Sequence, residues 1–153
     1  MINCFFEDSN QPVKLRHAVI DILIIENHKI LLVKRAKVLT SPGKWALPGG
    51  FVERDETLKQ AALREGLEES GYQVKILSLF RVIDNPNRRQ EPNQNVAFEF
   101  LAKPIQKIQS HDSEISQVKW FDLNNLPKAS EIAFDHLETI KQYIYSLGLG
   151  GRR

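Results

Sequence analysis

The segment from Thr57 to Gly71 constrains the fold of this chain most strongly, because it carries both a start and a stop signal for a helix. Thr57 and Gln60 form the pattern of a capping box, in which each side chain accepts a hydrogen bond from the other residue's backbone N–H. Gly71 stands where a left-handed C-terminal cap belongs. We therefore predict a helix from about Leu58 to about Ser70.

Three glutamates of this helix, Glu65, Glu68 and Glu69, share one face about 100° wide. Their carboxylates repel one another and face the negative end of the helix dipole, which is unfavourable by up to about 1 kcal/mol each. Arg64 alone cannot neutralise all three. A bound cation could, and oxygen ligands suit Mg²⁺ or Mn²⁺. An isolated acidic cluster is more often a solvated helix face, so the glutamates alone do not establish a metal site.

Predicted strands flank this helix and make the chain α+β. Runs rich in β-branched and aliphatic residues occur at residues 17–25 and 29–35, joined by a polar turn. Three further strands are predicted after the helix, at residues 72–83, 95–103 and 116–123.

The remaining segments are predicted as loops, a second helix and a tail. Residues 41–50, crossed by a short extended piece around residues 45–47, and residues 84–95 are interrupted by proline and polar residues. A helix is expected over roughly residues 130–147. Its apolar stripe comprises Ile132, Leu137, Ile140, Ile144 and Leu147. We expect one domain over residues 1–147 and a frayed tail over residues 148–153.

Composition excludes several kinds of partner. The chain has 21 Lys and Arg against 19 Asp and Glu, a net charge of +2, so extended nucleic acid is not expected to bind. Its single cysteine, Cys4, cannot form an internal disulfide, and the N-terminus lacks the pattern of a signal peptide. No apolar run reaches the length of a membrane span. We therefore expect a cytoplasmic protein without a membrane partner.

Gly50, Glu56 and the segment from Arg64 to Tyr72 resemble the box that defines the Nudix hydrolases, G-x5-E-x7-R-E-U-x-E-E-x-G-U, with U aliphatic. All seven fixed residues are in register over 23 positions, and the segments on both sides of the box are also similar. Gly66 and Tyr72 depart from the pattern at aliphatic positions. A glycine inside a helix costs about 1 kcal/mol relative to alanine, so Gly66 indicates either close backbone packing or a weakened motif.

The resemblance implies a mixed β-sheet sandwiched between helices, and hydrolysis of a nucleoside diphosphate linked to another group. It also implies that Glu65, Glu68 and Glu69 bind the divalent metal or position the attacking water. The carbonyl oxygen of Gly49 or Gly50 is implied as a further metal ligand.

Other roles follow from the same resemblance. Glu56 and Arg64 correspond to the pair that orients the helix. A further acid is expected from a loop outside the box, and Glu114 is the first candidate, with Asp112 second. Either Glu65 or Glu114 could be the general base.

Specificity has to come from residues other than the fixed residues of the box. Residues 84–89 and 133–136 resemble the branch of the family that hydrolyses ADP-ribose. The candidates for substrate binding are Arg35, Phe51, Arg88 and Arg89, although arginines in a polar loop are as often solvated. Trp45 and Phe80 could stack on a base but are expected in the core, and His136 is expected to pack or cap a helix.

Two other functions stay open. The first is a nucleoside triphosphate diphosphohydrolase that removes damaged or surplus nucleotides. The second is a sensor that binds a nucleotide without cleaving it, which is disfavoured because the box keeps every acid. Each of these functions implies a small nucleotide as the ligand, and a homodimer is open because many relatives are dimers.

Overall fold

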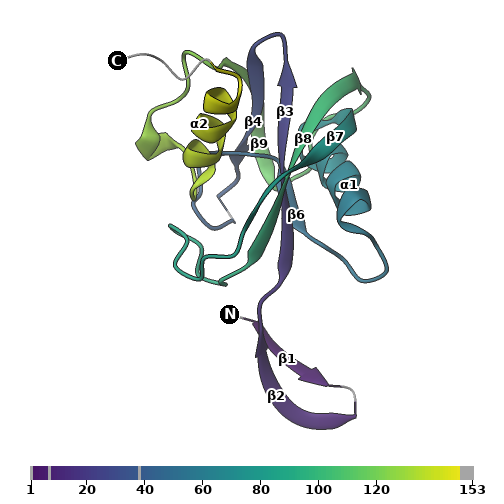
Figure 1. Cartoon of the computed structure of the whole chain (residues 1–153). Coiled ribbons are helices and arrows are strands. Elements are labelled where there is room, and N and C mark those ends of the chain that lie inside the picture. The colour runs from purple at the N-terminus through teal and green to yellow at the C-terminus, as the bar shows by residue number, and fades with distance from the viewer. Residues whose placement is uncertain (1, 7, 38, 149–153) are drawn as a thin grey trace.

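The computed structural model describes residues 2–6, 8–37 and 39–148. In chain order the elements are β1 (Ile2–Phe6), β2 (Ser9–Leu15), β3 (Ala18–Glu26), β4 (Lys29–Arg35), β5 (Trp45–Ala46), β6 (Gly49–Phe51), α1 (Leu58–Ser70), β7 (Tyr72–Ile83), β8 (Val96–Lys107), β9 (Ile115–Asp122), the short 3-10 helix η1 (Ala129–Glu131) and α2 (His136–Ser146). Figure 1 shows α1 and α2 on opposite sides of the main sheet.

The main sheet is mixed. Its strand order is β5-β4-β3-β8-β7, with β6 also paired to β3 and β9 also paired to β4. The β3–β8 pairing is parallel, whereas the other pairings in this sheet are antiparallel. A mixed sheet between helices confirms the predicted α+β class.

The two faces of the sheet bury separate apolar clusters, because side chains alternate along each strand. Ile20, Ile22 and Ile24 of β3 pack in the cluster that includes Ala61 and Ala62 of α1. Leu23 of the same strand packs on the other face, in the cluster that also contains Ile140 and Tyr143 of α2. The sheet therefore holds α1 and α2 in fixed positions around the strand ends.

The observed bounds of helix α1, Leu58–Ser70, confirm the prediction. Thr57 and Gln60 form the capping box, and Gly71 is left-handed at φ 75°. Gly66 packs closely against the sheet, since a Cβ there would lie 3.2 Å from a Val74 methyl group and 3.3 Å from the Ile22 Cδ1. Close packing is thus the reason for this glycine in the helix.

The second helix begins later than predicted. It starts at His136 rather than near residue 130; the short 3-10 helix η1 ends at Glu131, and the extended residues 132 and 133 pair with Trp45 before a turn leads into α2. The N–H of Ala133 donates to the carbonyl of Trp45 over 2.8 Å, and Ile132 forms a parallel bridge with Trp45. These partners lie far away in the sequence, so a helical periodicity could not reveal them.

Other differences concern short strands. Residues 49 and 50, predicted as the end of a loop, belong with Phe51 to β6, because these residues pair with β3 in antiparallel register. Strands β1 and β2 were not predicted; they pair with each other and extend away from the main sheet in Figure 1. The boundary of a single domain at residue 147 stays a prediction, and residues 149–153 of the expected tail lie outside the described residues.

In the part of the chain that the structure describes, no helix has both the length and the apolar character needed to span a membrane.

A buried acid lies between α2 and the sheet. Glu99 of β8 is fully buried, accepts a hydrogen bond from the Thr139 hydroxyl of α2 over 2.7 Å and lies 3.1 Å from the Arg81 Nε. Burial raises the pKa of Glu99 to about 7, and the neighbouring Asp21 carboxylate adds to this effect. Glu99 therefore takes up a proton more readily in the folded chain than in the unfolded chain.

This raised pKa predicts a pH-dependent stability. Below about pH 4.5, Glu99 is protonated in both states; between about pH 4.5 and 7 only the unfolded state loses the proton, which favours unfolding. We expect the free energy of unfolding to fall across this interval, relative to that of Glu99→Gln, by up to about 3 kcal/mol. Urea denaturation of both proteins from pH 4.5 to 8 measures it. A difference that does not change with pH would contradict the prediction.

Candidate active site

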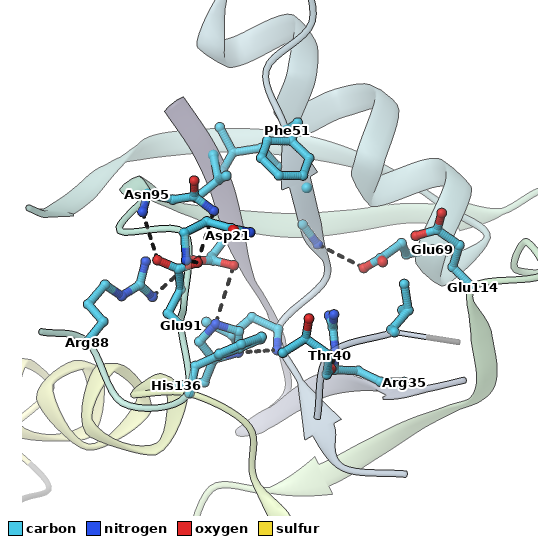
Figure 2. A pocket seen from close by; sticks show the side chains of 18 of the residues that line it. Asp21, Arg35, Thr40, Phe51, Glu69, Arg88, Glu91, Asn95, Glu114 and His136 are labelled. Atoms are coloured by element: carbon cyan, nitrogen blue, oxygen red, sulfur yellow. Dashed lines mark hydrogen bonds and ion pairs between the residues drawn. The ribbon is translucent and has the colours of Figure 1, made fainter. Parts of the chain in front are cut away.

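A cavity of about 300 Å³ lies where β3, β4, β6, α1 and the start of α2 meet. Figure 2 shows Glu69 and Glu114 together at one end of it, and Asp21, Arg88 and Asn95 at the other. The sheet, the helix of the box and the loop before β8 thus contribute side chains to one cavity.

Glu69 is the most buried of the three glutamates that the sequence singled out. Glu69 is 3% exposed, and its Oε2 accepts a hydrogen bond from the Gly49 N–H over 2.9 Å. Gly49 is held there by the pairing of β6 with Asp21 of β3. Burial raises the pKa of Glu69 to about 8, the nearby Glu65 carboxylate adds to the rise, and the Gly49 hydrogen bond opposes it.

Glu65 lies against the Gly-Gly turn. A Cβ at Gly50 would be 2.5 Å from the Glu65 Oε1, so the missing side chain leaves the space that this carboxylate occupies. Burial raises the pKa of Glu65, and the Arg64 guanidinium opposes the rise. Gly50 and Glu65 are therefore neighbours in space although they lie at opposite ends of the loop and helix of the box.

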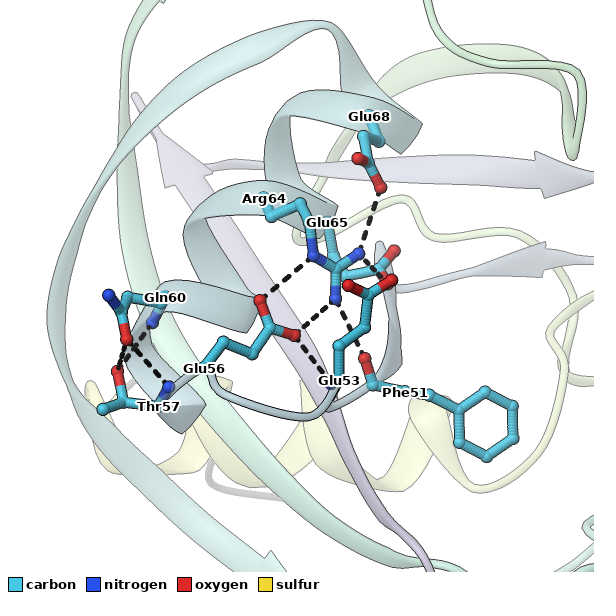
Figure 3. A network of polar contacts seen from close by, with 8 residues as sticks. All are labelled: Phe51, Glu53, Glu56, Thr57, Gln60, Arg64, Glu65 and Glu68. Carbon is cyan, nitrogen blue, oxygen red and sulfur yellow. Dashed lines mark hydrogen bonds and ion pairs between the residues drawn. The ribbon is translucent and has the colours of Figure 1, made fainter.

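Arg64 organises the outer side of the same helix (Figure 3). Its guanidinium donates to both carboxylate oxygens of Glu56, over 2.6 and 3.1 Å, and to the carbonyl of Phe51 over 3.0 Å. It also donates to Glu65 over 2.7 Å and to Glu68 over 3.1 Å. The hydrogen bonds from Arg64 lower the pKa of Glu56. One arginine therefore ties the loop after β6 to α1.

The acids fit a divalent cation by their chemistry. Burial raises the pKa of both Glu65 and Glu69, and a neighbouring carboxylate adds to each rise. A cation beside these two side chains would therefore stabilise their buried negative charges and reduce the repulsion between them. Glu65 and Glu68 turn toward Arg64 in this structure (Figure 3). Accordingly, no group of three or more acidic, histidine or cysteine side chains among the described residues is already arranged around a metal position.

Arg35 supplies positive charge to the cavity wall. Its Nε donates to the carbonyl of Thr40 over 2.6 Å, and its guanidinium carbon lies 5.1 Å from the centre of the Phe134 ring. Burial lowers the pKa of Arg35, whereas the Glu69 and Glu114 carboxylates oppose this effect. A guanidinium close to these acids suits a ligand that carries phosphate.

The other predicted substrate contacts fall in different environments. Phe51 lines the cavity and is 45% exposed. Arg88 also lines it, but its side chain is 3% exposed and donates to both oxygens of Asp135, over 2.6 and 3.0 Å. Arg89 is exposed and does not line the cavity. Trp45 and Phe80 pack in the cluster under α2, as their core assignment predicted.

Sequence reasoning missed Asp21 and Asn95, which also line the cavity and are 8% and 6% exposed. An acid inside the otherwise apolar strand 17–25 was a signal that could have found Asp21. Nothing in the sequence marked Asn95, because its position depends on the parallel pairing of β8 with β3. The structure also brings Glu114 to the cavity, as the loop before β9 reaches it.

This α+β fold places acids and a guanidinium around one cavity, a combination that suits a ligand carrying phosphate. A model of the NUDIX domain matches residues 15–143, and the chain belongs to the Nudix hydrolase family. It is an enzyme of the type that hydrolyses pyrophosphate bonds in small nucleotide substrates, and members of the family generally use divalent metal ions.

Three similar proteins illustrate the relationship. The chain is 40% identical over 126 residues to an ADP-ribose pyrophosphatase of Methanocaldococcus jannaschii, which covers 82% of this chain and 71% of that protein. It is 33% identical over 106 residues to a putative 8-oxo-dGTP diphosphatase of Bacillus subtilis, covering 69% and 66% of the two chains. The crystal structure of a NUDIX hydrolase from Nitrosomonas europaea superposes with a TM-score of 0.78 at 29% identity, covering 95% of this chain and 80% of that chain.

Proposed function

We propose that this enzyme hydrolyses ADP-ribose to AMP and ribose 5-phosphate. The observation that carries the proposal is one cavity in which Glu69 and Glu114 lie at one end, with Arg35 and the aromatic ring of Phe51 on its walls. A diphosphate needs charge compensation, and a base or sugar needs an apolar or aromatic surface. The 40% identity to an ADP-ribose pyrophosphatase supports this substrate.

The proposed roles follow from position and charge. Glu65, Glu68, Glu69 and the Gly50 carbonyl would hold Mg²⁺, or Mn²⁺. When bound, such an ion neutralises phosphate charge and lowers the pKa of water, which assists hydrolysis.

The remaining roles belong to side chains that hold or orient substrate. Either Glu65 or Glu114 would accept the proton of the attacking water. Arg35 would hold the phosphates, and Phe51 would contact the base. Glu56 and Arg64 would orient α1 through their ion pair, whose two hydrogen bonds fix its geometry.

Two assignments from the sequence carry less support. The guanidinium of Arg88 is committed to Asp135, and Arg89 lies outside the cavity lining, so neither is well placed to bind a phosphate without moving. Location in the cytoplasm and assembly into a homodimer stay predictions.

A substrate panel tests the proposed activity. With Mg²⁺, we expect kcat/KM for ADP-ribose to exceed that for dNTPs, NADH and diadenosine polyphosphates by at least about tenfold, which corresponds to about 1.4 kcal/mol of transition-state stabilisation. Chromatography that identifies AMP and ribose 5-phosphate as products defines the bond that is cleaved. Equal or faster turnover of a dNTP would overturn the assignment.

The second candidate is a nucleoside triphosphate diphosphohydrolase. The similarity to a putative 8-oxo-dGTP diphosphatase favours it, so 8-oxo-dGTP belongs in the same panel. Faster turnover of 8-oxo-dGTP than of ADP-ribose would select this function. A non-catalytic sensor is less well supported, because the box keeps every acid, Glu69 lines the cavity and Glu65 lies beside Gly50, which also lines it.

A further inference from the structure

His136, the first residue of α2, links that helix to the active-site turn. His136 is 3% exposed, and its Nδ1 accepts a hydrogen bond from the backbone N–H of Leu47 over 3.0 Å. Its Nε2 lies 3.4 Å from the Asp21 Oδ1. A nitrogen that accepts a hydrogen bond carries no proton, so the N–H of the ring is assigned to Nε2, which faces Asp21.

The Leu47 peptide is only two residues from the hydrogen bond that holds Glu69. Between them, the Pro48 carbonyl accepts from the Ile22 N–H over 2.8 Å, and Gly49 donates to Glu69. Leu47 is 2% exposed, so without His136 its N–H would be buried and unpaired, at a cost of about 1–3 kcal/mol. The segment would have to shift to reach another acceptor.

The placement of His136 itself is fixed from two sides. Asp21 lies at its Nε2, and the preceding residue, Asp135, forms the two-bond ion pair with Arg88. Both ring nitrogens therefore already face protein partners. This arrangement leaves His136 without a free nitrogen for proton transfer to a substrate, although the residue lines the cavity.

We propose that His136 is a positioning residue: by accepting the Leu47 N–H, it fixes residues 47–49 and so sets the position of the Glu69 carboxylate. Its consequence for catalysis rests on the proposed function, in which Glu69 holds the metal. A displacement of about 1 Å at a catalytic group can cost about 10²-fold in rate, so a hydrogen bond outside the reacting groups suffices to matter.

Two substitutions separate the two ring nitrogens. In His136→Asn, the short side chain places its amide oxygen near the Nδ1 position, where it can accept from Leu47. In His136→Gln, the longer side chain places its amide near the Nε2 position, where it can donate to Asp21 but leaves the Leu47 N–H unpaired. Thr139→Val is the matched control, because it removes the buried hydrogen bond from α2 to Glu99 and leaves residues 47–49 untouched.

The measurements are amide hydrogen exchange by NMR, and kcat and KM for ADP-ribose with Mg²⁺. For His136→Gln we expect at least tenfold faster exchange at Leu47 and Gly49, and a fall in kcat of about 30-fold with little change in KM. We expect His136→Asn to keep slow exchange and most of kcat. Thr139→Val should lower stability without changing exchange at Leu47 or kcat.

Equal effects of the asparagine and glutamine variants on kcat would overturn the proposal, and so would fast exchange at Leu47 with unchanged kcat. If the wild-type enzyme turned over no ADP-ribose, the proposed function would fail separately. The same kinetic comparison would then use whichever substrate of the panel is hydrolysed, and the exchange data would still accept or reject the hydrogen-bond chain.

Discussion

Replacing Glu69 with glutamine is expected to lower kcat/KM for ADP-ribose by about 10²- to 10³-fold while the protein stays folded. Glutamine has nearly the same shape, and its amide oxygen can still accept the Gly49 N–H. It cannot carry the negative charge that a metal ligand needs. Steady-state kinetics at saturating Mg²⁺ measure the loss, and a rate within threefold of wild type would reject the assignment of Glu69 to the metal site.

The same substitution should raise stability in the absence of metal. The pKa of Glu69 in the folded chain is about 8, above the ordinary value of 4.5, so the folded state holds the proton more tightly than the unfolded state. The wild-type chain therefore loses stability as the pH rises from about 4.5 to about 8, and the cost stays above pH 8. Urea denaturation in EDTA at pH 8 should find Glu69→Gln more stable than wild type.

Glu138→Gln provides the matched control. Glu138 is an exposed glutamate near the start of α2, so its substitution changes the same charge on a helix without touching the cavity. Neither kcat/KM nor the pH dependence of stability should change appreciably in this variant. A comparable loss of activity would indicate a general charge effect rather than a role specific to Glu69.

Replacing Gly49 with alanine is expected to destabilise the fold by about 3 kcal/mol or more. The new Cβ would overlap the carbonyl oxygen of Ile20 and lie 2.9 Å from the Asp21 Cα. Both are backbone atoms of the central strand β3, so they cannot move aside as the end of a side chain can. Chemical denaturation followed by circular dichroism measures the effect, and a stability within 1 kcal/mol of wild type would contradict it.

Gly50→Ala is the comparison for this prediction. Its Cβ would meet the carboxylate of Glu65, which is the far end of a flexible side chain, at 2.5 to 2.9 Å. We therefore expect a smaller loss of stability than for Gly49→Ala, together with a loss of activity because Glu65 is displaced. Equal destabilisation by both substitutions would contradict this expectation, because it would mean that the backbone of β3 shifts as readily as the Glu65 side chain.

Features governed by neighbours along the chain were predictable from the sequence. The bounds of α1 follow from Thr57, Gln60 and Gly71, whose interactions close within one helical turn. The common face of the three glutamates follows from helical spacing alone. The strands β3, β4, β7, β8 and β9 were also found from their composition, to within a few residues at each end.

Features governed by distant partners were decided only by the tertiary structure. Helix α2 starts late because residues 132 and 133 pair with Trp45, and β6 exists because it pairs with β3. The raised pKa of Glu69 depends on the protein packed around it, which spacing cannot reveal. The sequence by itself therefore determined which acids share a helix face, whereas tertiary packing decided which of them is buried, because burial comes from segments far away in the chain.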